Sequence, residues 1–584
     1  MRDLHRTKIV VSMVSAFLLF IMMSCGGGGS SSSRDTFSVG GTVTGLSGTL
    51  VVQNNGGDDL NINADGSFTF TSDLDDSATY NVTILTQPNG QTCSVSTGSG
   101  TISAADVNNV SISCSNIPVT GWSHPTGISD AIETPGVEPF GFQVALANNG
   151  DAVLAYYDLD DQGNGGVFKA ERRSGTWTYP ANMADDMGNF DQAEFRVDHY
   201  DPIARISMSD TGETLITWVQ YADFDGTAIV GDSVYKAEYR DNGSGVFNWT
   251  YPSDLADHLN WGYGKMHEMG DSALNASGEA IVAWAQSTNS GNPGVYKAEF
   301  FDSTWTFAEN SLDVISPNAN VYPTTRMPNV AINDDGDAII VWSQRYNYYT
   351  PDYRIMISEY DRSSDTWAHP ATISDNVNPT PGDARLPKVV LSNNGDAIVA
   401  WHQDAKIYIA HYTTAGGWVL PAADEEIFDG SSDPQVAMDD NGNAIIVWSA
   451  TDGTNKRIYM TEYRNGNWTT PEPISTTGSD TAFPQVAMSG NGEAVVLWRQ
   501  YVLQGSTNYN QLFIREYRND TWSAMPGLDE YISLDINIGD EVSFSSDNRP
   551  HLTMNDNGDT LIIWKQYDVA NNNAELIFMS EFNH

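Results

Sequence analysis

Short apolar runs separated by polar turns recur along most of the chain. The clearest copy spans residues 434–475, where the runs 435–438, 444–448, 457–463 and 468–474 are each bounded by Asn, Asp, Gly or Pro. Runs of this length between such turn residues predict β-strands joined by hairpins. The first turn suits a tight hairpin because Asn and Gly accept a positive φ. The pattern therefore predicts an all-β domain built from repeated four-stranded units.

The glycine of this first turn marks eight copies of the unit, spaced 47 to 66 residues apart, which indicates variable loops on a constant core. A large aromatic residue follows each glycine by six positions, and a second series, mostly Trp-x-x-Pro, lies in the fourth strand. One such ring buries about 150–250 Å², so both series are expected to pack the core. The glycines are Gly150, Gly212, Gly278, Gly336, Gly395, Gly442, Gly492 and Gly558. The first aromatic series is Tyr156, Trp218, Trp284, Trp342, Trp401, Trp448, Trp498 and Trp564. The second is Trp122, Trp177, Trp249, Trp305, Trp367, Trp418, Trp468 and Trp522.

The second strand of each repeat is apolar on both faces, as in residues 338–342. Such a strand suits a sheet packed between two other sheets, and radially packed four-stranded sheets form a β-propeller. The last repeat stops after its third strand (576–582), whereas an unpaired fourth strand (121–129) precedes the first repeat. We therefore expect an eight-bladed β-propeller over residues 118–584, closed by its N-terminal strand so that no bare sheet edge remains.

The N-terminus has the pattern of an export signal, in which basic residues precede an apolar run over residues 9–23. Met22-Met23-Ser24-Cys25 resembles the lipobox of bacterial lipoproteins, which implies removal of residues 1–24 and acylation of Cys25. The alternative is an ordinary secretory signal with an incidental Cys25. Residues 25–35 are rich in Gly and Ser and are expected to form a flexible tether. We thus expect an exported protein, anchored by lipid to the bacterial cell envelope at the outer membrane or cell surface.

Residues 36–117 are expected to form a separate β-sandwich, because alternating and β-branched runs are split by turn clusters such as 54–57. In an exported chain, Cys93 and Cys114 are expected to form a disulfide. The stretches 40–43 and 64–68 resemble an Ig-like module found near the N-termini of bacterial surface lipoproteins. This resemblance implies a spacer without an active site.

The formal net charge of −47 excludes some partners. Nucleic acid and anionic lipid surfaces would be repelled, so the membrane link should depend on the acyl group alone. The acidic residues are spread through turns and loops, a distribution that favours solubility in an extracellular setting.

Candidate ligand-binding residues lie beside the variable loops, where binding tends to reside on a rigid scaffold. Arg326, Arg385 and Arg549 stand just before prolines that open a first strand, and an arginine fork is a good carboxylate receptor. Gln344 and Gln403 belong to a series of glutamines two positions after the aromatic of the second strand. These amides are expected either to bind a sugar or peptide or to pair with backbone groups of the neighbouring loop.

The turns at 464–468 and 518–522 are similar to the degenerate Asp-box loops of sialidase-like propellers. The pattern Ser-x-Asp-x-Gly-x-x-Trp is not intact in any repeat, and sialidases have six blades. The resemblance implies one alternative function, a glycan hydrolase or lyase that uses the three arginines.

No group of residues in the sequence has the pattern of a catalytic site. A glutamate recurs in the third strand of nearly every repeat, which indicates a structural role because a catalytic acid is needed once or twice. The acidic hairpin turns contain oxygen ligands of the kind that Ca²⁺ prefers but lack EF-hand spacing, so no cofactor or metal site is expected beyond this calcium alternative. The interpretation favoured is a binding protein for a protein, peptide or glycan; the other alternative is a structural subunit of an envelope complex.

Overall fold

The computed structural model describes residues 35–584 with gaps. The segments left out are 47–48, 87, 89–90, 117–121, 126–127, 133, 135, 137, 161–164, 174, 189–203, 224–229, 242–245, 255–256, 261–264, 288–293, 318–324, 348–349, 351, 424–427, 430, 465, 478–479, 505–506, 529, 534–548 and 569–573. Cys25 and its tether lie outside the described residues. The described chain is all-β, with three short 3₁₀ turns at Ile128–Asp130, Met183–Asp185 and Ile373–Asp375. None of its helices has the length and apolar character needed to cross a membrane.

The chain forms two compact units, the first made mainly of Leu50–Thr86 and Cys93–Ser113 with the strands that precede them. Its alternating strands bury Val39, Val43, Val52 and Ile112, as one-sided sheets require. Cys93 and Cys114 are disulfide-bonded, which confirms that prediction. One four-stranded sheet contains β5 (Gly66–Thr69), β2 (Val39–Thr44), β10 (Val107–Asn116) and β8 (Gln91–Ser96). The other contains β4 (Gly57–Ile62), β3 (Leu50–Asn54), β7 (Thr79–Thr86) and β9 (Ser99–Thr101), while β1 (Thr36–Phe37) pairs with β6 (Leu74–Asp75).

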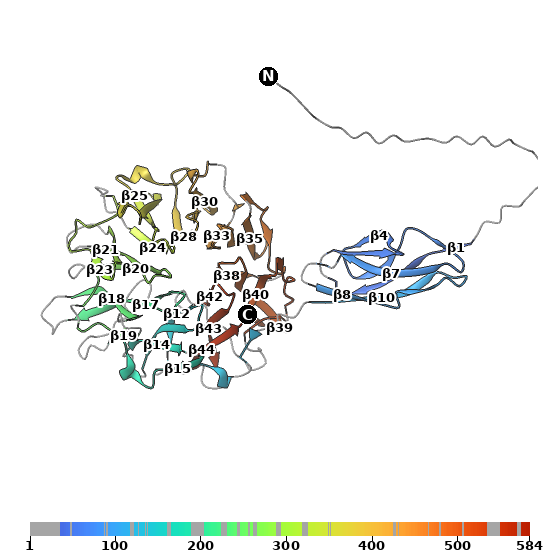
Figure 1. Cartoon of the computed structure of the whole chain (residues 1–584), viewed down its shortest axis with the longest axis horizontal. Coiled ribbons are helices and arrows are strands. Elements are labelled where there is room, and N and C mark those ends of the chain that lie inside the picture. The colour runs from blue at the N-terminus through green and yellow to red at the C-terminus, as the bar shows by residue number, and fades with distance from the viewer. Residues whose placement is uncertain are drawn as a thin grey trace, which may run out of the picture. The chain divides into compact units, whose positions relative to one another are not determined.

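The second unit, Cys114–His584, is a β-propeller whose described residues form eight sheets around a common axis (Figure 1). Sheets 1 to 4 are β12–β15 (Phe140–Leu146, Ala152–Leu159, Gly165–Arg173, Thr176–Thr178), β16–β19 (Arg205–Met208, Thr214–Asp223, Val230–Asp241, Phe247–Thr250), β20–β23 (Lys265–Leu274, Ala280–Ser287, Gly294–Phe301, Thr304–Phe307) and β24–β27 (Thr325–Ile332, Ala338–Asn347, Asp352–Asp361, Thr366–Ala368). Sheets 5 and 6 are β28–β31 with β32 (Ala384–Leu391, Ala397–Gln403, Lys406–Thr413, Gly417–Val419, Phe428–Asp429) and β33–β37 (Ser431–Met438, Ala444–Thr451, Lys456–Arg464, Asn467–Trp468, Glu472–Pro473). Sheet 7 is β38–β41 (Thr481–Met488, Ala494–Gln504, Thr507–Arg518, Thr521–Trp522). Sheet 8 is β42–β44 (His551–Met554, Thr560–Asp568, Ala574–Phe582) with β11 (Trp122–Ser123).

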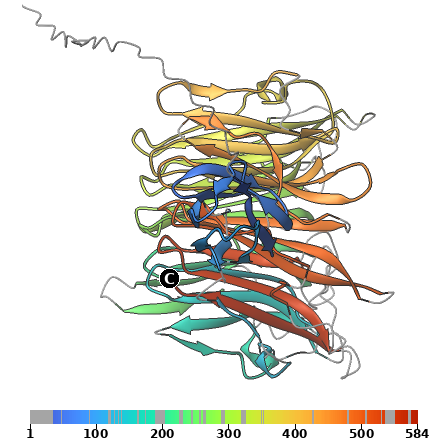
Figure 2. The same ribbon diagram turned by 90° about the vertical axis from the view of Figure 1, so that its right-hand side faces the viewer.

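The innermost strands of neighbouring sheets contact each other around the ring, from β12 through β42 and back to β12. The strands of all these sheets extend from one end of the ring to the other (Figure 2). We call the end where innermost strands begin the loop end, and the end carrying the hairpins after those strands the turn end.

Packing between sheets explains why the second strands are apolar on both faces. The seven tryptophans of the first aromatic series are fully buried, as is Tyr156. In six sheets the indole N–H donates to the glutamine two residues later, for example Trp342 Nε1 to Gln344 Oε1 at 3.1 Å. The prediction that these rings form the core is confirmed.

Strand β11 completes sheet 8, which confirms the predicted closure. Trp122 pairs with Phe582 and Ser123 with Glu581 in antiparallel register. Trp122 Nε1 also donates to Glu516 of sheet 7 at 3.0 Å. The two ends of the second unit are therefore joined within one sheet.

Candidate functional site

A layer of polar residues lies on the innermost strands, seven positions before each turn glycine. Electrostatic interactions across the ring indicate that these side chains gather near its axis. Lys388 of sheet 5 interacts electrostatically with Asp271 and Arg205 of sheets 3 and 2, and with Asp433 and Arg549 of sheets 6 and 8. We call the layer the axial layer: Gln143, Arg205, Asp271, Asn329, Lys388, Gln435, Gln485 and His551.

Hydrogen bonds tie the axial layer to neighbouring sheets. Asn329 Nδ2 donates to Asp271, and its Oδ1 accepts from Val389 N at 2.8 Å. Arg205 Nε donates to the carbonyl of Gly270 at 2.8 Å. The layer is therefore held in place by the fold before any ligand arrives.

Burial sets the protonation of the axial layer. Burial, together with the charges of Arg205 and Lys388, lowers the pKa of His551 to about 4, so this ring is neutral at neutral pH. Burial also lowers the pKa of Lys388, while Asp271 opposes that effect. The axial layer thus holds two basic side chains, Arg205 and Lys388, beside one carboxylate, Asp271, in a chain whose net charge is strongly negative.

The innermost strands reach the loop end through strained bulges. In sheets 4 to 7 the residue before the strand proline has a left-handed backbone: Met327 (φ 55°), Leu386 (55°), Asp433 (60°) and Phe483 (53°). The pairing register shifts at each of these positions. A residue before proline normally avoids this conformation, and such strain often marks functional sites.

Two clusters, each with one aromatic ring and two arginines near it, lie beside these bulges. In the first, Tyr353 has Arg385 Cζ at 4.5 Å and Arg345 Cζ at 5.8 Å from its ring centroid. Arg385 donates through Nε to Asp383, and its side chain is 39% exposed. This cluster joins sheets 4 and 5 at the loop end.

The second cluster joins sheets 7 and 8. Phe483 has Arg549 Cζ at 4.9 Å and Arg499 Cζ at 5.5 Å from its ring centroid. Arg549 Nη1 lies 3.0 Å from Asp433 Oδ2, and the arginine side chain is 39% exposed. A guanidinium carries five N–H donors, and among the described residues the contact with Asp433 uses only the Nη1 group of Arg549.

The residues predicted as ligand contacts fall into different environments. Arg385 and Arg549 lie in the two clusters, whereas the side chain of Arg326 lies outside the described residues. Gln344 is fully buried, accepts from Trp342 and donates from Nε2 to the Pro317 carbonyl at 2.9 Å. Gln403 donates likewise to the Thr380 carbonyl at 2.9 Å. Both amides hold adjacent loops, as the structural interpretation expected, and their contact with a ligand stays a prediction.

Sequence reasoning missed the axial layer and the aromatic partners of the arginines. The axial layer had a readable signal, since a polar residue stands seven positions before all eight turn glycines. Tyr353 and Phe483 had none, because their contacts with arginines depend on how bulges and neighbouring sheets meet.

The repeated glutamate of the third strand is structural, as expected. Its carboxylate accepts from the fourth-strand tryptophan of the next sheet, as in Trp305 Nε1 to Glu238 Oε1 at 3.0 Å. Seven of the eight junctions have this bond: Glu171 with Trp249, Glu238 with Trp305, Glu299 with Trp367, Glu359 with Trp418, Glu462 with Trp522, Glu516 with Trp122 and Glu581 with Trp177.

Carboxylates also gather at the turn end. Asp210, Asp334, Asp440 and Asp556 come from every second sheet, and burial with the charges of the other three raises the pKa of Asp210 to about 6. Among the described residues, no group of three or more His, Cys, Asp or Glu side chains could hold a metal ion.

No family model matches the chain, and no curated protein matches it. Several solved structures are similar at low identity. An α-L-arabinanase of Penicillium chrysogenum is 16% identical (57% of this chain, 93% of that chain, TM-score 0.31). The fucose-binding lectin of Aleuria aurantia is 14% identical (57% and 96%, TM-score 0.31), and a PL25 ulvan lyase is 9% identical (71% and 96%, TM-score 0.37). Likenesses of this size do not identify a ligand for this chain.

Proposed function

We propose that the chain is a binding protein of the bacterial cell envelope that captures an acidic glycan at the loop end of an eight-bladed propeller. The observation that supports this proposal is the pair of arginine–aromatic clusters beside an axial layer that contains Arg205 and Lys388, in a chain of net charge −47. Arginine forks suit carboxylate and sulfate groups, while the local excess of cations steers anions to this end.

The geometry of this site suits glycan binding better than it suits catalysis. Arg385 and Arg549 each pair with a separate aspartate and lie in separate clusters, so they do not form one receptor around a single carboxylate. Two separated cationic clusters suit a polymer with repeated anionic groups. The glycan-active enzyme and the structural subunit remain the alternative functions.

Titration calorimetry of the purified chain tests the proposed ligand. We expect polygalacturonate or sulfated galactan to bind with an affinity that falls as salt rises, and neutral galactan not to bind. Arg385→Ala and Arg549→Ala should each weaken binding at least about tenfold, the loss expected when a charge-assisted contact is removed. Arg362→Ala at the turn end is the matched control and should have no effect.

Two outcomes would overturn the proposal that the ligand is an acidic glycan. Binding of polyglutamate alone would indicate an acidic protein partner, and equal binding of neutral galactan would remove the role of the arginines. Conversion of a bound polymer to shorter products would favour the enzyme.

We further propose that the first unit is an Ig-like spacer and that acylated Cys25 anchors the protein. The lipobox-like sequence and the Gly/Ser tether support this proposal. In a bacterial host, Cys25→Ser should abolish labelling by a palmitate analogue and release the chain from the membrane fraction; unchanged membrane association would contradict it.

A further inference from the structure

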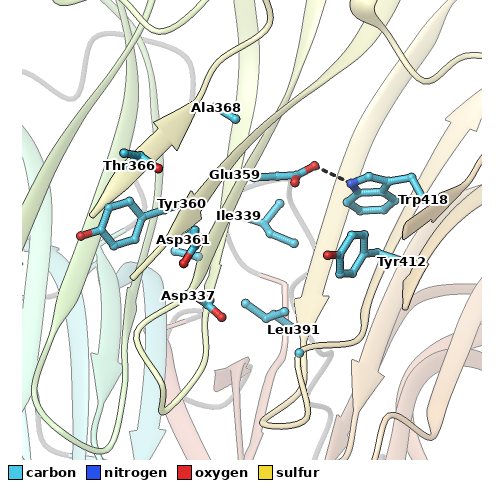
Figure 3. Close-up of a pocket in the computed structure, with 12 residues that line it drawn as sticks. Asp337, Ile339, Glu359, Tyr360, Asp361, Thr366, Ala368, Leu391, Tyr412 and Trp418 are labelled. Atoms are coloured by element: carbon cyan, nitrogen blue, oxygen red, sulfur yellow. Dashed lines mark hydrogen bonds between the residues drawn. The ribbon is translucent and has the colours of Figure 1, made fainter. Parts of the chain in front are cut away.

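A cleft of about 500 Å³ opens at the turn end between sheets 4 and 5. Glu359 and Tyr360 of β26 line it from sheet 4, and Tyr412 and Trp418 line it from sheet 5 (Figure 3). Glu359 accepts a hydrogen bond from Trp418 Nε1, as the equivalent glutamates do at other junctions. Ile339 and Leu391 supply an apolar wall.

Other junctions show what occupies the corresponding space. At four of them, an arginine stands two residues after the third-strand glutamate. Arg464 contacts Glu462 and the ring of Tyr517. At the other three junctions the arginine makes the same four contacts. It contacts that glutamate, the acidic residue after its own turn glycine, the carbonyl of the next turn glycine and an aromatic ring of the next sheet. Arg173 contacts Glu171 (3.2 Å), Asp151 (3.2 Å), Gly212 O (3.1 Å) and the Tyr239 centroid (4.0 Å). Arg240 contacts Glu238 (2.7 Å), Glu213 (3.8 Å), Gly278 O (2.5 Å) and the Phe300 centroid (3.9 Å). Arg518 contacts Glu516 (2.9 Å), Glu493 (2.7 Å), Gly558 O (3.1 Å) and the Phe582 centroid (3.7 Å).

The junction between sheets 4 and 5 has the same four receptor groups but no arginine. By register the groups are Glu359, Asp337, the carbonyl of Gly395 and the ring of Tyr412, and all four residues line the cleft. The arginine position is Asp361. The receptor is therefore complete while its usual occupant is replaced by a third carboxylate.

Glu359 differs from its counterparts in its charge partners. The other six third-strand glutamates each form an ion pair with a lysine or arginine: Glu171, Glu238, Glu299, Glu462, Glu516 and Glu581. In the part of the chain that the structure describes, Glu359 forms none. A half-buried carboxylate of this kind gains most from a cation that enters the cleft.

We propose that this cleft binds a guanidinium group supplied by another molecule. The carboxylates of Glu359 and Asp337 would accept its N–H groups, and Tyr412 would stack on its plane. The apolar wall suits the methylenes of an arginine side chain. The source is either an arginine of a partner polypeptide or a small alkylguanidinium. This site lies at the opposite end of the ring from the proposed glycan site and does not rest on it.

Titration of the purified chain with agmatine, N-acetyl-arginine amide, N-acetyl-lysine amide and the peptide Gly-Arg-Gly tests the proposal. We expect both arginine probes and agmatine to bind at least tenfold more tightly than the lysine probe. Similar affinity for agmatine and the peptide would indicate a small ligand, whereas tighter binding of the peptide would indicate a polypeptide partner. Failure of every guanidinium probe to bind at 10 mM, or equal binding of lysine, would overturn the proposal.

Two variants locate the site. Glu359→Gln should weaken agmatine binding at least tenfold with little change in fold. Asp361→Arg should place an internal guanidinium in the cleft, as Arg240 does at its junction, so that it raises the melting temperature and abolishes binding. Asp335→Arg, an exposed turn residue with the same change of charge, is the matched control and should leave binding unchanged. Unaltered agmatine binding in Glu359→Gln would overturn the assignment even if Asp361→Arg failed to fold.

Discussion

At the scale of single residues, Asp210 gives the second unit a pH dependence. Burial and the neighbouring aspartates raise its pKa to about 6, so the folded state holds a proton that the unfolded chain loses near pH 3.8. This contribution to stability is present below about pH 3.8 and is lost as pH rises through 6. We expect Asp210→Asn to raise the free energy of unfolding by on the order of 1 kcal/mol at pH 8, a figure reduced for partial solvent exposure, and to change it little at pH 3.5.

Denaturant unfolding in EDTA at both pH values measures this difference. Asp335→Asn, at an exposed position of an equivalent turn, removes the same charge and should have a smaller effect at pH 8. An equal gain from both variants would show that net charge alone sets the stability.

At the scale of elements, the junctions between sheets depend on the bond from the fourth-strand tryptophan to the third-strand glutamate. Trp305 donates to Glu238, whereas the glutamate that should face Trp468 is replaced by His411. Both tryptophans pack on a neighbouring aromatic ring, at 5.5 and 5.1 Å between centroids. Trp305→Phe should therefore cost about 1.5–3 kcal/mol more than Trp468→Phe, because only the first loses a hydrogen bond to a charged acceptor.

Equilibrium unfolding of the two variants compares them directly, since each makes the same change of volume. Equal losses would mean that ring packing and not the indole bond holds neighbouring sheets together.

The sequence predicted the strands and their core well because each repeat carries its own hairpin glycine and its own aromatic residues. It also indicated that the third-strand glutamate is structural, because this residue occurs seven times and catalysis needs an acid only once or twice. It did not indicate the partner of that glutamate. Glu238 and Trp305 are 67 residues apart and belong to different sheets, so their contact depends on how sheets pack. The sequence also did not indicate that Asp361 stands where other junctions have an arginine that fills the space between sheets, because this depends on how equivalent junctions compare in space.

At the scale of the whole molecule, one short strand closes the ring. Trp122 packs against Phe582 at 5.6 Å between centroids and donates to Glu516, so it contacts both sheet 8 and sheet 7. His124 Nδ1 and Ser580 Oγ lie 2.9 Å apart, and Ile132 N donates to the Ile577 carbonyl at 2.8 Å. Deletion of residues 119–130 would remove the contacts of Trp122 and His124, but not the bond from Ile132, and would leave the edge of β44 unpaired.

We expect this deletion to cost at least about 3 kcal/mol, the usual loss when a large core aromatic is removed, and to lower the melting temperature of the second unit. The free edge of β44 should also pair with other chains, because unpaired N–H and C=O groups template strand addition. Calorimetry and light scattering measure the two effects, with deletion of residues 26–33 as a control that removes no described strand. Trp122→Phe keeps strand pairing but loses the bond to Glu516, so it should fall between the control and the deletion. A deletion with an unchanged melting temperature would mean that contacts between innermost strands, from β42 to β12, are enough to hold the ring closed.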